Sequence, residues 1–123
     1  MGSGAGFVEE GIFNYKQEDS AFGVKLLKRK DNEHNNNPMY ANKSKMYAHR
    51  NTEKKVVQIT VYENGIRMYD IDWGHTHDSF KKGEPHIQYY KDGQRDRRRP
   101  AEAPTPEQIE LVKNVRKRWN NEE

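Results

Sequence analysis

Three histidines in a stretch of twelve residues are the side chains best suited to chemistry in this sequence. His75 and His77 lie in the run Trp-Gly-His-Thr-His at 73–77, and His86 follows Pro85. Imidazole titrates near neutral pH and also binds metal ions, so it serves both proton transfer and metal chemistry. If the segments on either side are extended, all three side chains converge at one end of a sheet, and we predict the functional site there.

Two chemistries fit these histidines. In metal-free RNA cleavage, one imidazole removes the 2′-hydroxyl proton and another protonates the leaving 5′-oxygen, so two of His75, His77 and His86 would suffice. Alternatively, the His-x-His spacing presents two nitrogens to Zn²⁺ or another divalent metal, and the third histidine completes a site with an open position. In a purely structural interpretation, His75 and His77 cap a loop and His86 is an ordinary strand residue.

Neighbouring side chains supply the other groups that either chemistry needs. Asp72, and Asp70 before it, precede the histidines and could orient an imidazole through its second nitrogen. Guanidinium groups could stabilise a phosphate in the transition state, and a tyrosine could stack on a base. The substrate-binding candidates are Arg67, Tyr89, Arg95, Arg97 and Arg98.

A β-hairpin leads into the histidines. Residues 55–62 and 66–73 carry alternating apolar side chains, and Asn64 and Gly65 between them favour a tight turn because both tolerate positive φ. The two-residue period of a strand puts Asp70 and Asp72 on one face, and Arg67, Tyr69, Ile71 and Trp73 on the other. A further strand is expected at 86–90, which makes a three-stranded antiparallel meander.

A capped helix closes the chain. Thr105 is the predicted N-cap, Pro106 takes the first helical position and Gln108 completes a capping box. The apolar stripe that follows can dock on the sheet; it consists of Ile109, Leu111, Val112, Val115 and Trp119. Short strands are expected near 11–15 and 21–27, whereas 31–54 and 91–104 should be rich in loops.

Composition limits the class of protein. A chain of 123 residues with 32% hydrophobic and 33% charged residues fits a single domain, 1–123, with a thin core, and residues 1–6 resemble a linker. No apolar run is long enough for a membrane span, and there is no cysteine for a disulfide or thiolate site. The net charge of +3 is clumped, which suits a polyanion such as RNA.

The run at 67–77, together with Gly-Glu-Pro-His at 83–86, resembles the C-terminal toxin modules of bacterial polymorphic and contact-dependent toxin systems. Such modules often combine an aspartate-rich strand, a histidine-bearing turn and a Pro-His pair leading into another strand. The resemblance covers about a third of the chain, from Val56 to Tyr90, and carries over the residues Asp70, Asp72, His75, His77 and His86. It implies the cytotoxic tip of a larger secreted or contact-delivered protein, which acts in the target-cell cytoplasm and is neutralised by an immunity protein.

The sequence therefore predicts an α+β domain with a small antiparallel sheet and one packed C-terminal helix. It is expected to act as a ribonuclease, without a cofactor, through His75, His77, His86 and Asp72. The alternatives are a non-catalytic module that binds nucleic acid or protein, and a metal-dependent DNase that uses the same histidines.

Overall fold

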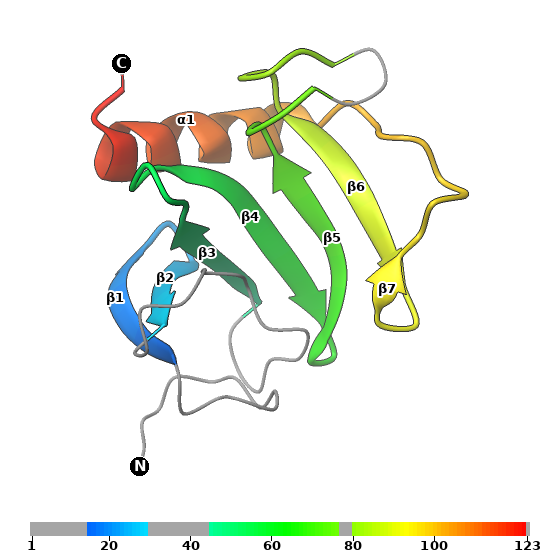
Figure 1. Ribbon diagram of the computed structural model, residues 1–123, viewed down its shortest axis with the longest axis horizontal. Coiled ribbons are helices and arrows are strands. Elements are labelled where there is room, and N and C mark those ends of the chain that lie inside the picture. The colour runs from blue at the N-terminus through cyan, green and yellow to red at the C-terminus, as the bar shows by residue number, and fades with distance from the viewer. Residues whose placement is uncertain (1–14, 30–44, 77–79, 123) are drawn as a thin grey trace.

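A seven-stranded sheet and one C-terminal helix make up the part of the chain that the computed structural model describes, residues 15–29, 45–76 and 80–122 (Figure 1). The elements are β1 Tyr15–Ala21, β2 Val24–Arg29, β3 Met46–Arg50, β4 Val56–Glu63, β5 Ile66–Asp72, β6 His86–Lys91, β7 Gln94–Arg95 and α1 Pro106–Asn120. The predicted α+β class, with a mainly antiparallel sheet and a packed helix at the end, is confirmed.

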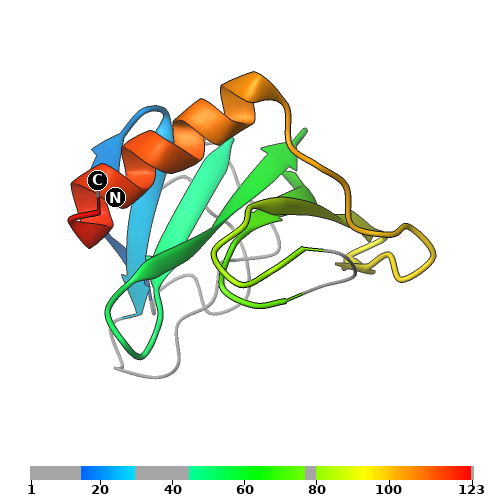
Figure 2. The ribbon, with the colours of Figure 1, turned by 90° about the horizontal axis from the view of Figure 1, so that it is seen from above.

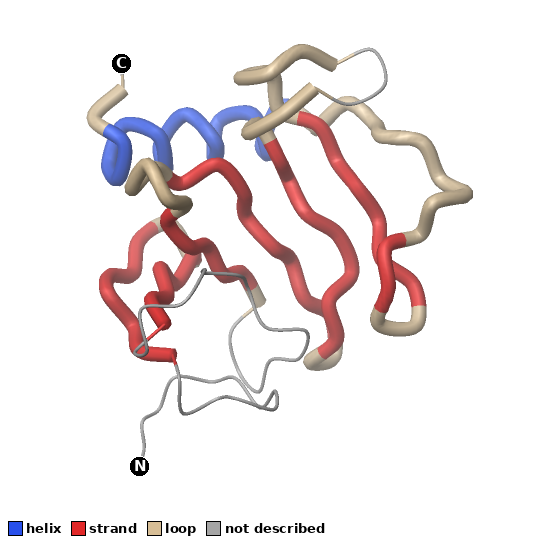
Figure 3. The backbone as a smooth tube through the Cα atoms, in the orientation of Figure 1, coloured by secondary structure: helices blue, strands red, loops and turns tan. Residues whose placement is uncertain are grey.

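The strands lie in the sheet in chain order, so each is hydrogen-bonded to its neighbour in sequence (Figure 3). All pairs are antiparallel except β2 with β3. Three hairpins turn through two residues at positive φ, at 22–23, 64–65 and 92–93, the conformation that tight type I′ turns require. The predicted Asn-Gly hairpin and the β4–β5–β6 meander are confirmed.

One face of the sheet is apolar. A row of directly paired residues crosses five strands on this face, namely Leu26, Ala48, Ile59, Ile71 and Ile87. All five side chains are at most 3% exposed. Helix α1 lies across this face, as Figure 2 shows from above.

Helix α1 begins and docks as its sequence predicts. Thr105 and Gln108 form the capping box, with Pro106 in the first turn. Val112, Val115 and Trp119 are buried in the core, but Ile109 stays 38% exposed. A buried large apolar side chain typically contributes about 1.5–3 kcal/mol, so these three residues stabilise the docked helix.

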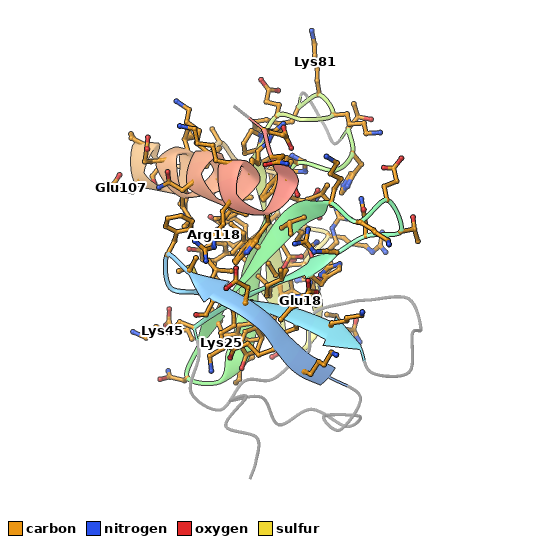
Figure 4. All side chains as sticks on the ribbon, turned by 90° about the vertical axis from the view of Figure 1, so that its left-hand side faces the viewer. Glu18, Lys25, Lys45, Lys81, Glu107 and Arg118 are labelled. Atoms are coloured by element: carbon orange, nitrogen blue, oxygen red, sulfur yellow. The ribbon has the colours of Figure 1, made fainter. Side chains whose placement is uncertain are left out.

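Polar contacts fix the C-terminal half of α1 to the sheet and to the loop after β5. The Asn120 side chain accepts a hydrogen bond from the Val56 N–H at 2.8 Å and donates one to the Val56 carbonyl at 2.7 Å. Arg116 Nη1 donates to the Gly83 carbonyl at 2.9 Å. In Figure 4, Arg118 of the helix lies above β1, where its guanidinium pairs with Asp19 at 3.0 Å.

The other face of the sheet is polar and nonetheless buried. Thr60, Asp70 and Gln88 form one row of paired residues, and Gln58, Asp72 and His86 form the next. Of these six residues, all but Gln58 are buried. Such burial is favourable only when the polar groups bond to one another, and they do.

A β-bulge changes one predicted face. Tyr69 pairs with Val61 and Arg67 with Tyr62, so Met68 is an extra residue in β5. The strict two-residue alternation predicts Arg67 and Asp70 on different faces of the strand, and that prediction is wrong. The bulge brings Arg67 onto the polar face, where it contacts Asp70.

Two further expectations differ from the structure. Strand β3 lies within the segment 31–54 and the short strand β7 within 91–104, although both segments were predicted to be mainly loop. In the N-terminal part, the turn at 22–23 interrupts the strand expected at 21–27, so β1 ends at Ala21 and β2 begins at Val24. Residues 11–14 of the earlier expected strand lie outside the described residues. Among the described helices, none has the length and apolarity needed to cross a membrane.

Candidate functional site

Asp72, His75 and His86 come together at one end of the polar face. Asp72 is the last residue of β5, His86 is the first residue of β6, and the two are direct partners across the strands. The chain turns sharply after β5 because the Gly74 N–H donates to Asp72 Oδ1 at 2.9 Å. This turn brings His75 back over the sheet, with its Nδ1 at 3.2 Å from the same carboxylate oxygen.

The turn requires glycine at position 74 because there is no room for a side chain. A Cβ at this position would lie 2.8 Å from Val57 Cγ2, closer than side-chain carbons approach one another. The backbone of Gly74 therefore lies directly against β4, which fixes the position of the residue that follows it, His75.

Gln88 joins the two imidazoles. Its amide nitrogen lies 3.2 Å from His75 Nε2 and 3.0 Å from His86 Nε2. On the far side of each ring, Nδ1 has an acceptor: Asp72 Oδ1 for His75, and the Glu84 carbonyl at 3.2 Å for His86. Because an amide NH₂ only donates, we assign both rings as neutral, with the proton on Nδ1 and a lone pair on Nε2.

The two histidines differ in access to solvent. The His75 side chain is 49% exposed, whereas His86 is 0% exposed. Phe80 stacks against His86 with ring centroids 5.4 Å apart, and the His75 ring meets His86 edge-on at the same separation. A substrate can therefore contact His75 directly, whereas His86 is buried and packs against the His75 ring.

The described part of the chain also contains one group of side chains suited to a metal ion. Asp72, His75 and His86 each offer a ligand atom, and these atoms lie within 4.8 Å of one another. The predicted metal alternative had combined His75 and His86 with His77, which lies outside the described residues. The role predicted for His77 in either chemistry stays a prediction.

No protein family, curated protein or solved structure was found to match this chain. Its function must therefore be argued from its own side chains. The resemblance to bacterial toxin modules stays a prediction.

Arg67, predicted to bind a phosphate, is buried in an ion pair. It is 4% exposed, its Nε and Nη2 donate to Asp70 Oδ1 at 3.1 and 3.0 Å, and Nη2 also contacts Oδ2 at 3.0 Å. Tyr90 lies against its guanidinium at 4.3 Å. Burial alone would lower the pKa of Arg67, but the Asp70 carboxylate raises it above its ordinary value.

Asp70 shares this burial, and the burial acts on its carboxyl. Burial raises the pKa of its carboxyl above the ordinary value, against the opposing pull of Arg67 and of the Thr60 hydroxyl, which donates at 2.8 Å. Both Asp70 and Arg67 thus act inside the sheet, and neither is presented to a substrate.

The remaining substrate-binding candidates lie away from the histidines. Tyr89 faces the helix side, where its hydroxyl donates to Glu102 at 2.6 Å and Arg99 stacks on its ring at 3.4 Å. Arg95, Arg97 and Arg98 line an open hollow of about 430 Å³ at the β6–β7 turn. Five residues of extended strand separate this end of β6 from His86, about 16 Å.

The sequence analysis did not predict two residues of the site, Gln58 and Gln88. Gln58 Nε2 donates to Asp72 Oδ2 at 3.0 Å, and Gln88 bridges the two imidazoles. The signal that could have found Gln88 is its spacing, because it lies two residues after His86 and so shares its face of β6. For Gln58, only the register of β4 against β5 reveals the contact.

Proposed function

We propose that this domain cleaves RNA and that His75 is its principal proton-transfer group. The observation that carries the proposal is the contact between Asp72 Oδ1 and His75 Nδ1 at 3.2 Å. A buried carboxylate that holds Nδ1–H leaves the Nε2 of a half-exposed imidazole as an unprotonated acceptor, which is the form that a general base needs. Asp72 also stabilises the imidazolium that forms when Nε2 takes up a proton.

In the proposed reaction, the substrate's 2′-hydroxyl replaces the Gln88 amide as the partner of His75 Nε2. His75 accepts the hydroxyl proton while the 2′-oxygen attacks the adjacent phosphorus, and the bond from phosphorus to the 5′-oxygen breaks. The products are a 2′,3′-cyclic phosphate and a 5′-hydroxyl, which takes its proton from a second acid. His86 is too buried for that second role, and His77 remains the predicted candidate.

Basic side chains at the β6–β7 turn support binding of the RNA strand. Arg95, Arg97 and Arg98 line the open hollow there, with Arg95 in β7 and the other two in the segment that follows it. Cations at this distance bind phosphates that flank the scissile one, so they affect affinity more than the chemical step. We assign them to substrate binding and assign Arg67 to structure.

The resemblance to toxin modules supports a biological setting for this activity. We propose that the domain is the toxic part of a larger secreted or contact-delivered protein, acts on RNA in the target-cell cytoplasm and is neutralised by an immunity protein. Expression of the domain in a bacterial cytoplasm should then arrest growth, and the His75→Ala variant should not. Growth that is unaffected by an actively cleaving wild-type domain would contradict this setting.

The activity is tested by incubating the purified protein with total RNA and with plasmid DNA, each with and without a chelator. We expect RNA loss that survives the chelator and falls by about 10²–10⁴-fold in His75→Ala, the usual contribution of a general base. His49→Ala is the matched control, because it removes a histidine from β3, three strands and about 14 Å from β6. Equal cleavage by His75→Ala, or intact RNA throughout, would overturn the proposal.

A non-catalytic nucleic-acid-binding module is the second candidate, and the arginine-lined hollow favours it. In that case His75→Ala would bind RNA as tightly as the wild type, and Arg97→Ala with Arg98→Ala would weaken binding and reduce its salt dependence. Each lost phosphate contact lowers the slope of log affinity against log salt by about 0.7 for a single strand. Plasmid cleavage that the chelator abolishes would instead indicate the metal-dependent DNase.

A further inference from the structure

We propose that His75 and His86 form a binding site for a divalent transition-metal ion such as Zn²⁺, with the Gln88 side-chain oxygen as third ligand, and that the ion inhibits the domain. The inhibitory part rests on the proposed ribonuclease function, whereas the binding part does not. The argument starts from the position of one nitrogen atom, Nε2 of Gln88, between two imidazoles.

The Gln88 amide nitrogen occupies the place where a cation would be bound. Both histidines direct an Nε2 lone pair at it, over 3.2 Å from His75 and 3.0 Å from His86. An NH₂ group that donates one hydrogen to each of two imidazoles is the hydrogen-bonded counterpart of a metal ion held by two imidazoles. Neutral imidazole nitrogens are the commonest protein ligands of Zn²⁺.

The outer contacts of both rings are those of metal-binding histidines. A ligating histidine almost always donates its other N–H to a carboxylate or a backbone carbonyl, which fixes the tautomer and the ring plane. His75 has Asp72 in this role, and His86 has the Glu84 carbonyl. The two rings are therefore prepared for a ligand at Nε2 before any ion arrives.

Asp72 is better suited to orienting His75 than to binding the ion itself. Its Oδ1 accepts hydrogen bonds from the Gly74 N–H and faces His75 Nδ1, and its Oδ2 accepts one from Gln58. Direct coordination would break these contacts. The carboxylate thus contributes its charge and its hold on the imidazole, and the third ligand must come from another side chain.

Gln88 can supply that ligand by rotating its amide. The terminal torsion of glutamine is broad and roughly two-fold, and its other side-chain torsions let the amide draw back, so the carbonyl oxygen can turn toward an ion that takes the present place of the NH₂. Zn–N bonds are about 2.0–2.1 Å, so the rings must approach the ion by about 1 Å from their present hydrogen-bonded distances. His75 lies on the exposed turn after β5 and can make this movement, while His86 stays fixed in the sheet.

Bound metal would occupy the lone pair that the proposed mechanism uses. His75 Nε2 cannot accept the 2′-hydroxyl proton while it ligates an ion. Zn²⁺ should therefore inhibit RNA cleavage with a concentration dependence that follows its binding, and removal of the ion by a chelator should restore full activity.

The binding part is measured without RNA, by competition between the protein and a coloured chelator for Zn²⁺ alone. We expect one ion per chain. His75→Ala should weaken binding at least tenfold, and Asp72→Asn should weaken it about 10–100-fold because the orienting carboxylate is lost. Gln88→Glu should strengthen binding, since a carboxylate oxygen is a better Zn²⁺ ligand than an amide oxygen. His49→Ala is the control and should leave affinity unchanged.

These experiments test the metal site and the ribonuclease function independently. Zn²⁺ binding that is absent, or that His75→Ala and Gln88→Glu both leave unchanged, overturns the metal site whatever the RNA assay shows. Tight binding at this site in a domain that leaves RNA intact supports the site and overturns the ribonuclease. Cleavage that requires Zn²⁺ overturns its inhibitory role.

Discussion

Replacing Arg67 by methionine distinguishes a phosphate-binding arginine from one that holds the sheet together. Arg67 and Asp70 are 4% and 1% exposed, and three nitrogen–oxygen contacts of 3.0–3.1 Å join them. Methionine fills a similar volume but removes the positive charge, so the Asp70 carboxylate keeps the Thr60 hydroxyl as a donor and loses its counter-ion. We therefore expect Arg67→Met to lower the free energy of unfolding.

The expected loss is large. Breaking a buried ion pair by removing one partner typically costs about 3–5 kcal/mol. For a domain of this size, that corresponds to a melting temperature lowered by more than about 10 °C, or to a urea midpoint lowered by about 2 M. The double variant Arg67→Met with Asp70→Leu should recover most of the loss, because no buried charge then remains uncompensated.

The loss of unfolding free energy in Arg67→Met should depend on pH. Without Arg67, the pKa of Asp70, already raised by burial, rises further, so the folded variant prefers the protonated carboxyl. The deficit in unfolding free energy relative to wild type should therefore be fullest at neutral pH and shrink as pH falls toward protonation of Asp70.

Urea unfolding followed by circular dichroism measures the stability, and RNA cleavage per folded molecule measures the activity. A stability change within about 0.5 kcal/mol, combined with lost RNA cleavage, would refute the structural role and restore Arg67 as a phosphate ligand. Arg97→Ala is the control for removing an exposed arginine, and its stability should match the wild type.

Three further outcomes follow from the site and the helix contacts. Asp72→Asn should reduce RNA cleavage at least tenfold with little loss of folded protein, because the neutral amide no longer stabilises the positive charge that His75 gains on taking up a proton, and the loss should appear in kcat rather than in KM. Asp19 has its pKa lowered by hydrogen bonds from Arg118 and Trp119, so its contribution to stability is present above about pH 4 and lost as pH falls further. In wild type, Trp119 fluorescence should report this loss, and in Asp19→Asn the acid-dependent part should be missing. Gly74→Ala should cost about 1–3 kcal/mol in thermal unfolding, because its methyl group would overlap β4. An unchanged melting temperature would contradict the requirement for glycine at this position.

Local sequence patterns predict several parts of the fold correctly. The hairpin at 64–65 follows from Asn-Gly, whose residues adopt positive φ at low cost, and the start of α1 follows from the Thr-Pro-Glu-Gln run. The turn at 22–23 was not predictable in this way, since Phe22 adopts φ of 56° in place of Asn or Gly. Strand β3 was missed because polar, turn-forming residues surround it, and only its pairing with β2 and β4 makes it a strand.

The sequence by itself determined the candidate residues Asp72, His75 and His86 and the sheet end where they gather, because a strand followed by a return strand brings its flanking residues together. Only the tertiary structure decided how accessible each of them is. Burial, which depends on how β5 and β6 pack, makes His86 a supporting residue and leaves His75 open to substrate. The bulge at Met68, a matter of register between β4 and β5, turns Arg67 from a surface cation into a buried partner of Asp70, since one extra residue reverses the face on which a strand's side chains lie.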